Sequence, residues 1–433
     1  MKRASLALLS FIIAIHVAYL LPQRNQSQIL SQNYALTICP GSINKSRALA
    51  LLPSSNLPFK YLASLSNSFR SAGNGNLLLS QGAIVEKGDP RNSLSILSNS
   101  SHWTTATSCS KSTNESWFVG GTADVSSQGV VSLVNSGLSE ASVEVTSYTE
   151  NGQVAPQIIK IPAASDKRAR IDSFSPGASR VVLHIVVKSG RVSSFVLDEQ
   201  TKGLKNLGGD LINPIASPSQ SVLIPALPAT LGKNSKVDST LRILAPGDVN
   251  GSVSIEVITP TSTFVPTELS NININSQKVR DISLAGIDVG SSNFALRINA
   301  TVPVVASVKT RASTSKISDF TWQTAVNSFS QISFNLYGLE PTITFVADTI
   351  DIDINWRDSS GKNHAKKLIG QSMLNWQVPA NTRLLNFSSR QGVSAAALWT
   401  TQDGIAYLPL AIASTIESAA RPIADAGVLQ SRT

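Results

Sequence analysis

The sequence predicts an all-β protein in which three tandem immunoglobulin-like β-sandwich domains follow one N-terminal transmembrane helix. Only 15% of the residues are charged, and Ser, Thr, Asn and Val are abundant, a composition that suits strands with hydroxyl- and amide-covered faces. Short apolar runs alternate with turn residues, and a unit of roughly 90 to 110 residues recurs. At 433 residues the chain is long enough for several domains, each with its own core.

Residues 1–24 are expected to form a signal-anchor, that is, a transmembrane helix. Lys2 and Arg3 precede an apolar run from Ala4 to Leu21, and about 18 helical residues span roughly 27 Å. No Ala-x-Ala motif follows the run, which favours an anchor over a cleaved signal peptide. The basic residues would hold the N-terminus in the cytoplasm. We therefore expect a single-pass protein of the cell membrane, in contact with the lipid bilayer, with its body on the extracytoplasmic side.

The sequence contains two cysteines, Cys39 and Cys109, and both follow the expected membrane segment. Disulfides persist in extracytoplasmic compartments, so a structural bridge is the expected state. Closing a loop of about 70 residues would stabilise the fold by roughly 4 kcal/mol. The alternatives are a metal site, for which His102 is the nearby histidine, and a redox pair, which lacks Cys-x-x-Cys spacing.

The domain boundaries follow from composition and strand spacing. Residues 25–116 are rich in Pro, Ser, Asn and Gly, so we expect an irregular region, much of it loop, with short strands at Tyr34–Ile38 and Leu77–Val85. The three sandwiches are placed at residues 117–215, 216–322 and 323–412, before a tail at 413–433. One helix is predicted, at Leu410–Ala420.

Internal repetition is the main support for three similar sandwiches. Ser142–Val145 resembles Ser254–Val257, and Val192–Val196 resembles Val304–Val308, both at an offset of about 110 residues. Val393–Ala397 supplies the matching strand of a third copy. Each copy has strands with one apolar face, and two sheets can bury such faces against each other.

Two further details of the repeat can be placed. In the first copy, Val143–Thr146 and Ile158–Ala163 flank a turn and are expected to pair as a hairpin. In the third copy, Ile350–Ile354 provides the alternating strand, and Trp376–Ala380 takes the place held by Ile159–Ala163.

Several short motifs follow one another in order along the chain. They are Cys39-Pro40-Gly41, Cys109, Trp117-Phe118-Val119-Gly120-Gly121, Val131–Asn135, Leu223–Ala226 and Asp319-Phe320-Thr321-Trp322. In order and spacing they resemble an actinobacterial envelope family that is catalogued as a domain of unknown function. The resemblance implies a single N-terminal membrane segment and an exported β-rich body, and it brings no catalytic residues.

Candidate chemistry is sparse in this sequence. The histidines are far apart, and neither a His-Glu-x-x-His nor a Gly-x-Ser-x-Gly motif is present. The net charge of +9 is dispersed, with the densest clusters outside the N-terminus at Lys167-Arg168 and Lys366-Lys367. Neither cluster lies among aromatic residues that stack on bases. We expect no catalytic, cofactor-binding or metal-binding residues, no cofactor and no nucleic-acid partner.

One acidic cluster and the tryptophans require a choice between two interpretations. The cluster consists of Asp348, Asp351, Asp353 and Asp358, and Asp351 and Asp353 share a strand face; a solvent-facing stripe is preferred, and a calcium site is the alternative. Core anchoring is preferred for the tryptophans over a carbohydrate-stacking platform. The tryptophans in question are Trp117, Trp322, Trp356, Trp376 and Trp399.

Trp117 and Phe118 are the candidate binding residues, although packing beside Gly120-Gly121 is the simplest explanation for them. These observations favour a non-enzymatic scaffold or adhesion module of the cell envelope, with envelope proteins or glycans as candidate partners. The alternatives are a cell-wall polysaccharide-binding module and an enzyme that acts on envelope glycans. An exposed row of aromatic residues would favour the first alternative, and a pocket with an acid pair the second.

Overall fold

The computed structural model describes residues 36–411 except 45, 53–56, 63–68, 72–75, 80–81, 88–94, 112, 232–234, 314–317 and 403. This part of the chain consists of strands with two 3-10 turns, η1 (Ile171–Ser173) and η2 (Thr267–Leu269), and no α-helix. The all-β class is therefore confirmed. No helix among these residues is long and apolar enough to cross a membrane. The expected anchor at residues 1–24 and tail at 413–433 lie outside the described residues.

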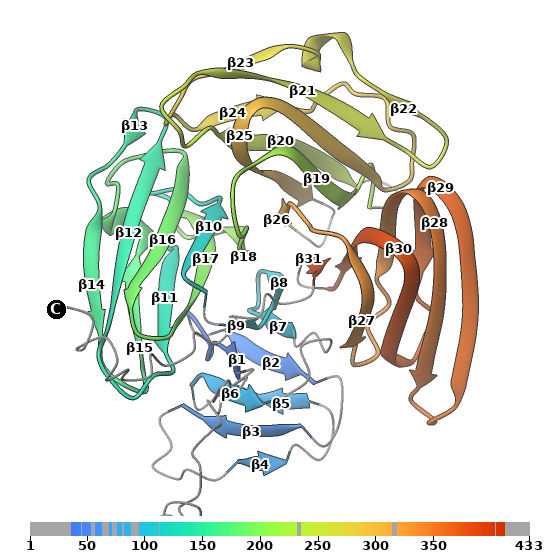
Figure 1. The fold of residues 1–433 in the computed structure, drawn as a ribbon, viewed down its shortest axis with the longest axis horizontal. Helices are drawn as coiled ribbons and strands as arrows, with labels where there is room; N and C mark the ends of the chain where they lie inside the picture. Colours follow the sequence, from blue (N-terminus) through green and yellow to red (C-terminus); the bar gives the residue numbers. More distant parts are fainter. Residues whose placement is uncertain are drawn as a thin grey trace, which may run out of the picture. The chain divides into compact units, whose positions relative to one another are not determined.

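Residues 36–111 form an N-terminal unit of nine short strands in two sheets (Figure 1). One sheet has the order β4-β3-β6-β1-β9 and the other the order β5-β2-β7-β8. The strands are β1 (Leu36–Cys39), β2 (Arg47–Leu51), β3 (Pro58–Tyr61), β4 (Arg70–Ser71), β5 (Asn76–Leu78), β6 (Ile84–Lys87), β7 (Ser95–Asn99), β8 (Thr104–Ser108) and β9 (Ser110–Lys111).

The described part of this region contains more strands than the two predicted from the sequence, and buried hydroxyl groups explain why the others were missed. The Cys39–Cys109 disulfide is present, which confirms the predicted bridge, and it lies in a core with Leu52, Leu79 and Ile96. Much of the remaining interior is polar. Ser and Thr residues fill strands β7 and β8, where several are almost fully buried. A search for alternating apolar residues does not detect strands of this kind.

The first sandwich unit packs two sheets around a shared apolar core. One sheet has the order β10-β16-β12, with β13 and β14 paired to β12, and the other has the order β15-β11-β17-β18. The predicted hairpin is confirmed, because Val143 lies opposite Ile159. The strands are β10 (Glu115–Val119), β11 (Val130–Asn135), β12 (Ala141–Thr149), β13 (Gly152–Gln153), β14 (Gln157–Ile161), β15 (Ser165–Arg170), β16 (Val181–Ser189), β17 (Val192–Lys202) and β18 (Lys205–Ile212).

The second sandwich unit repeats this pairing scheme strand for strand. Strand β20 pairs with β24 and the end of β25, as β11 pairs with β15 and β17; β21 pairs with β23 and the start of β25, as β12 pairs with β14 and β16. The strands are β19 (Ser219–Leu227), β20 (Lys236–Leu244), β21 (Gly251–Ile258), β22 (Thr263–Phe264), β23 (Ile272–Ile274), β24 (Arg280–Ser283), β25 (Phe294–Ser313) and β26 (Ser318–Thr324).

The register of the two units confirms the sequence repeat. Val196 lies opposite Val131 in the first unit, and Val308, its match in the sequence, lies opposite Leu241 in the second. The units differ at one connection. The chain breaks between β16 and β17, whereas β25 continues through the equivalent position as one strand of 20 residues.

The third sandwich unit uses the same scheme with fused strands. Its strands are β27 (Phe329–Asn335), β28 (Thr342–Asp358), β29 (Asn363–Gln377), β30 (Thr382–Thr400) and β31 (Ile405–Leu410). One part of β28 pairs with the end of β30 at Phe345–Ala395, and the other with its start at Ile354–Phe387. A single five-stranded sheet thereby encloses a core that contains Phe345, Phe387 and Trp376.

Two predictions for the third copy need correction, and strand fusion explains the first. Trp376 lies opposite Ile343, in the part of β29 that corresponds to β15, so its match to the β14 segment is wrong by one strand. The two parts of β29 are joined without a loop, through an irregularity at Ser372, whose φ is +59°. The helix predicted at Leu410–Ala420 does not begin at Leu410, which ends strand β31, and residues 412–420 lie outside the described chain.

Candidate functional site

Strand β26 belongs to the second unit but contacts other units on both faces. Because side chains alternate along a strand, Phe320 and Trp322 point to one face and lie in the apolar core of the first unit. Asp319 and Thr321 point to the other face, where their partners are on β8, β18 and β31. Polar regions lie on both sides of β26. One surrounds Asp319 and Thr321, and the other is a cavity that Trp322 lines beside the apolar core.

The first region is centred on the carboxylate of Asp319. It accepts backbone N–H groups from Gly209 on β18 (3.0 Å), Phe320 on β26 (2.8 Å), Thr104 on β8 (3.2 Å) and Ile405 on β31 (3.1 Å). These strands come from all four units. Burial raises the pKa of Asp319 to about 8, although the four amide donors favour its ionised form. One side chain thus joins the main chains of all four units.

Asp210 on β18 extends this region. It accepts a hydrogen bond from the backbone N–H of Trp322 (2.6 Å), from the hydroxyl of Thr321 (3.0 Å) and from the hydroxyl of Thr105 on β8. Burial raises its pKa well above the usual range for a carboxyl group. Asp210 and Asp319, together with the groups that donate to them, are called the carboxylate junction below.

Two glycines allow the strands to approach the junction. A Cβ atom on Gly404 would overlap a carboxylate oxygen of Asp319 and the backbone nitrogen of Thr104. A Cβ atom on Gly208 would lie 2.5 Å from the other carboxylate oxygen, and the φ of this residue is +115°, a conformation that suits glycine. Neither position tolerates a side chain while the junction keeps its geometry.

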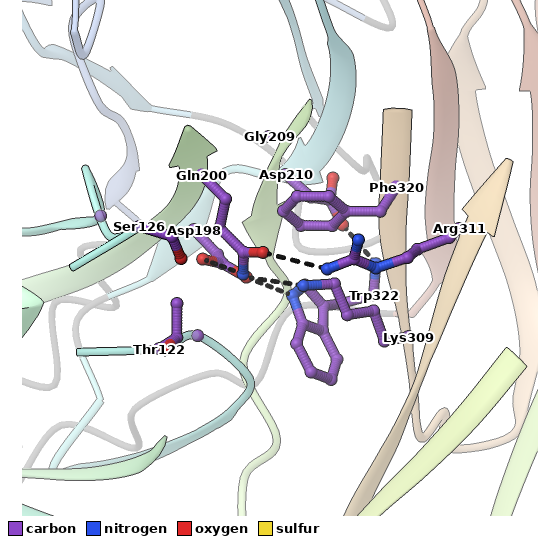
Figure 2. Close-up of polar contacts among 12 residues, drawn as sticks. Thr122, Ser126, Asp198, Gln200, Gly209, Asp210, Lys309, Arg311, Phe320 and Trp322 are labelled. Atoms are coloured by element: carbon purple, nitrogen blue, oxygen red, sulfur yellow. Dashed lines mark hydrogen bonds and ion pairs between the residues drawn. The ribbon is translucent and has the colours of Figure 1, made fainter. Parts of the chain in front are cut away.

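The second region is a cavity of about 300 Å³ between the first and second units. Its walls are mainly polar, and three cationic side chains line it: Arg242 on β20, and Lys309 and Arg311 on β25. Figure 2 shows Lys309, Arg311 and Gln200 beside Trp322, with Thr122 and Ser126 on the other side of the group. This space, with its lining residues, is called the basic cavity.

Arg242 is the best-satisfied of the three cations. Its guanidinium group forms two hydrogen bonds with the carboxylate of Asp281, at 2.8 and 3.0 Å, and donates to the carbonyl of Gly121 at 2.5 Å. It also lies over the ring of Trp322, 4.9 Å from the ring centroid. These contacts make Arg242 a fixed wall of the cavity.

Lys309 is poorly satisfied by comparison. Its ammonium nitrogen lies 3.7 Å from a carboxylate oxygen of Asp198 and 3.8 Å from the centroid of Phe320. Asp198 already accepts hydrogen bonds from Gln200 and from the indole N–H of Trp322. No described residue accepts a hydrogen bond from the ammonium group of Lys309. Burial lowers the pKa of Lys309 to about 8.

Arg311 lies two residues further along the same face of β25 and is exposed. Among the described residues it makes one hydrogen bond, to the amide oxygen of Gln200 at 3.3 Å. Asp124 also lines the cavity and accepts hydrogen bonds from the backbone N–H and the hydroxyl of Ser126. Burial acts to raise the pKa of Asp124, but these hydrogen bonds outweigh it and lower the pKa.

The candidate binding residues Trp117 and Phe118 are both buried. Phe118 lies in the core of the first unit. Trp117 stacks on the ring of His184, with 3.8 Å between the ring centroids, and donates its indole N–H to Glu115 at 2.7 Å. His184 is 3.0 Å from the same oxygen of Glu115, and burial lowers its pKa. The contacts of both aromatic rings are those of packing residues.

The other sequence candidates also have structural roles. Asp351 forms an ion pair with Lys367 at 2.8 Å, and Asp358 accepts hydrogen bonds from the turn residues Ser360 and Lys362 between β28 and β29. No group of His, Cys, Asp or Glu among the described residues could hold a metal ion. Core anchoring is confirmed for four of the five tryptophans considered, and Trp356 is partly buried.

No sequence motif pointed to the junction or the cavity as a site. Asp319 appeared as part of a family motif, and Trp322 appeared there and among the tryptophans expected to anchor the core. The sequence does contain a signal for these carboxylates. Asp198 directly follows the apolar run Val192–Leu197, and Asp210 directly precedes the run Leu211–Ile215. A carboxylate at such a position must find partners when it is buried.

Three solved structures that resemble the chain have low TM-scores. One is Thermotoga maritima 1070, with 15% identity, a TM-score of 0.22, and 25% of this chain and 93% of that chain covered. Another is the Streptomyces avermitilis α-L-rhamnosidase complexed with L-rhamnose, with 6% identity, a TM-score of 0.14, and coverage of 83% and 53%. A third is a tetra-tandem repeat in the extending region of a large adhesion protein, with 9% identity, a TM-score of 0.10, and coverage of 87% and 97%.

All three TM-scores are below 0.5, so these likenesses assign neither fold nor function to the chain. No curated protein matches the chain. A family model matches residues 103–369, which begin at the end of the N-terminal unit and extend into the third sandwich unit. Both the junction residue Asp319 and the cavity residue Lys309 lie within the match. The chain belongs to a family of unknown function (DUF5719).

Proposed function

We propose that this protein is a non-enzymatic scaffold or adhesion module of the cell envelope, anchored by one N-terminal membrane segment with its body on the extracytoplasmic side. The Cys39–Cys109 disulfide supports this location, because such bonds persist in oxidising compartments. The apolar run from Ala4 to Leu21 after two basic residues supports the anchor. Envelope proteins or glycans are the proposed partners.

The observation that carries the scaffold proposal is the junction at Asp319. A scaffold must hold its binding surfaces at fixed separations, and domains connected only by linkers move relative to one another. Here one buried carboxylate accepts backbone amides from β8, β18, β26 and β31. These contacts favour one rigid body over a flexible string of domains.

The two alternatives have weaker support. A polysaccharide platform built from tryptophans requires exposed rings, and Trp117, Trp322, Trp376 and Trp399 are buried. Glycan hydrolysis requires two available carboxyl groups at a suitable separation. The carboxylates that line the basic cavity are already engaged, Asp281 with Arg242 and Asp124 with Ser126.

We further propose that the three sandwich units are immunoglobulin-like. In immunoglobulin domains, strands B and E share one sheet while C and F share the other. The pairs β11–β15 and β12–β16 are arranged in this way. The edges differ, because the first strand of the unit, β10, pairs with β16, and its later strand β17 pairs with β11. The proposed likeness therefore concerns the central strands.

The test has two parts: it measures where the chain is located in the cell and which envelope proteins the purified chain captures. Protease treatment of intact cells should cleave a tagged full-length chain outside the membrane, and fractionation should recover the uncut chain with the membrane. Purified protein should then capture defined envelope proteins, whereas a variant with the junction broken, Asp319→Asn, should capture less of them. Recovery of the body in the cytoplasm would contradict the proposed location. Turnover of an envelope glycan by the purified chain would contradict the non-enzymatic role.

A further inference from the structure

We propose that the basic cavity binds a small ligand through an oxyanion, a phosphate or a carboxylate group, held by Lys309 and Arg311. This inference does not depend on the scaffold proposal, because it rests on a cavity between two units and not on cell location. It assigns a ligand class to a site that has no sequence motif.

The first step of the argument is the unused hydrogen-bonding capacity of the two side chains. An ammonium group has three donors and a guanidinium group five. Among the described residues, the ammonium of Lys309 has no hydrogen-bond acceptor, and Arg311 has one, Gln200, at 3.3 Å. Buried polar groups are normally paired, so a nearly buried lysine with no acceptor indicates a missing partner.

The second step concerns the position of the two cations. Lys309 and Arg311 are two residues apart on β25, so they project from the same face of the strand. Both line the cavity, with Arg311 exposed and Lys309 more buried. An anion that enters the cavity from solvent would first contact the guanidinium group of Arg311. It would then reach the ammonium group of Lys309, which lies deeper in the cavity. Arginine and lysine together form a common arrangement for phosphate and carboxylate groups.

The third step is the charge balance of the lining. The cavity is lined by three cations and two carboxylates, Asp124 and Asp281. Asp281 is occupied by Arg242 through two hydrogen bonds, and Asp124 by Ser126. Asp198 lies close to Lys309 at 3.7 Å but already accepts from Gln200 and Trp322. The capacity that remains is therefore cationic.

The fourth step is size and polarity. The volume of about 300 Å³ is at the lower end of the range for small-molecule sites, about 300 to 1,000 Å³. Hydroxyl groups of Thr122, Ser126, Ser179 and Thr240 line the same space. These side chains can form hydrogen bonds with the hydroxyls of a ligand of monosaccharide size. A large apolar molecule would leave them without hydrogen-bond partners.

Calorimetric titration of the disulfide-bonded full-length chain tests this inference. The probes are inorganic phosphate, glucuronate and, as a neutral control, glucose. We expect saturable binding of at least one anion and none of glucose over the same concentration range. Tighter binding of phosphate would identify the phosphate class, and tighter binding of glucuronate the carboxylate class. Equal heats for glucose and both anions, or no saturable binding at all, would overturn the inference.

Variants locate the site. Lys309→Met replaces the ammonium group by an unbranched apolar side chain of similar length, and Arg311→Gln changes an exposed side chain, so at least the second variant should fold. Each should weaken anion binding about tenfold or more, the loss of one charge-assisted contact. Lys366→Gln, on an exposed position of β29, is the matched control and should bind as the unchanged protein does. If Arg311→Gln binds anions as tightly as the control, the site is not the basic cavity.

Discussion

The carboxylate junction and the basic cavity lie on opposite faces of one strand, β26, and they use charge in opposite ways. In the junction, Asp319 and Asp210 accept seven hydrogen bonds, most of them from backbone amides of other strands. In the cavity, Lys309 and Arg311 have few acceptors and a space of about 300 Å³ beside them. Carboxyl groups whose hydrogen-bonding capacity is fully used, next to closely packed glycines, indicate a structural role. Cationic groups with unused hydrogen-bond donors, next to open volume, indicate a binding role.

Changing Asp319 to Asn should give the largest effect in either region. The amide NH₂ group would face two of the four backbone N–H donors, which would then be buried without an acceptor. At about 2 kcal/mol for each donor, the free energy of unfolding should fall by about 4 kcal/mol. Denaturant unfolding measures this value. Asp348→Asn, at an exposed position on β28, is the control and should stay within about 0.5 kcal/mol.

A substitution at Gly404 tests how closely the chain packs around Asp319 in the carboxylate junction. Gly404→Ala should lower the free energy of unfolding by about 2 kcal/mol, because the new methyl group overlaps the Asp319 carboxylate and the chain must shift. Gly361, at the β28–β29 turn, has nothing within 4 Å of its added Cβ but also a φ of +89°. Gly361→Ala therefore reports backbone strain without overlap. If Gly404→Ala is the milder of the two, the junction is less tightly packed than described.

Replacing Lys309 should have a smaller effect on stability. Lys309→Met removes the cation beside Asp198, but that carboxylate keeps its hydrogen bonds from Gln200 and Trp322, so the free energy of unfolding should fall by less than the roughly 4 kcal/mol expected for Asp319→Asn. The same denaturant experiment measures it. A loss comparable to that of Asp319→Asn would show that Lys309 is a structural residue and would remove the contrast between the regions.

The pH dependence of anion binding tests the same cation. The pKa of Lys309 lies at about 8 in the folded protein, below its ordinary value of 10.5, so the charged form is lost as pH rises through 8. Affinity for glucuronate, whose carboxylate stays ionised over this range, should therefore fall about tenfold between pH 7 and pH 9. The charged groups around Lys309 are Asp198 on β17, Arg242 on β20, Asp281 on β24, Arg311 on β25 and Asp124 before β11. An affinity that is constant over this range in calorimetry would exclude Lys309 as the binding cation.

His184 should give the smallest effect. Burial lowers its pKa below 6.5 in the folded protein, so the unfolded chain binds the proton more readily. The free energy of unfolding should then decline as pH falls below about 6.5, by under about 1 kcal/mol in total. His184→Gln should remove that part of the decline, as measured by denaturant unfolding at pH 7 and pH 5. An unchanged slope in the variant would assign the decline to other groups.

The sequence predicted the repeated part of the fold well. Matching Val192–Val196 to Val304–Val308 identified positions that occupy equivalent registers, because the first segment pairs with β11 and the second with its counterpart β20. In the N-terminal unit, strands such as β8 were missed because their buried side chains are mostly those of Thr and Ser. The disulfide was predicted because two cysteines that follow an expected membrane segment offer one intramolecular pairing.

The two polar regions could not be predicted, because their residues are distant in the chain. Thr104, Gly209 and Ile405 meet Asp319 only after four units have packed together. Trp117 and Phe118 drew attention as aromatic residues beside two glycines, yet both are packed inside. A single sequence indicates that a buried carboxylate needs donors, but it does not indicate which backbone amides will supply them.

Amide hydrogen exchange in the unchanged chain and in Asp319→Asn tests the central claim most directly, because it observes the donors themselves. The amides of Thr104, Gly209 and Ile405 belong to three different units and share this one acceptor. If the carboxylate joins the units, all three should be strongly protected in the unchanged chain and should lose protection together in the variant. Loss of protection at one amide alone, or at none, would contradict the claim that Asp319 holds the four units as one body.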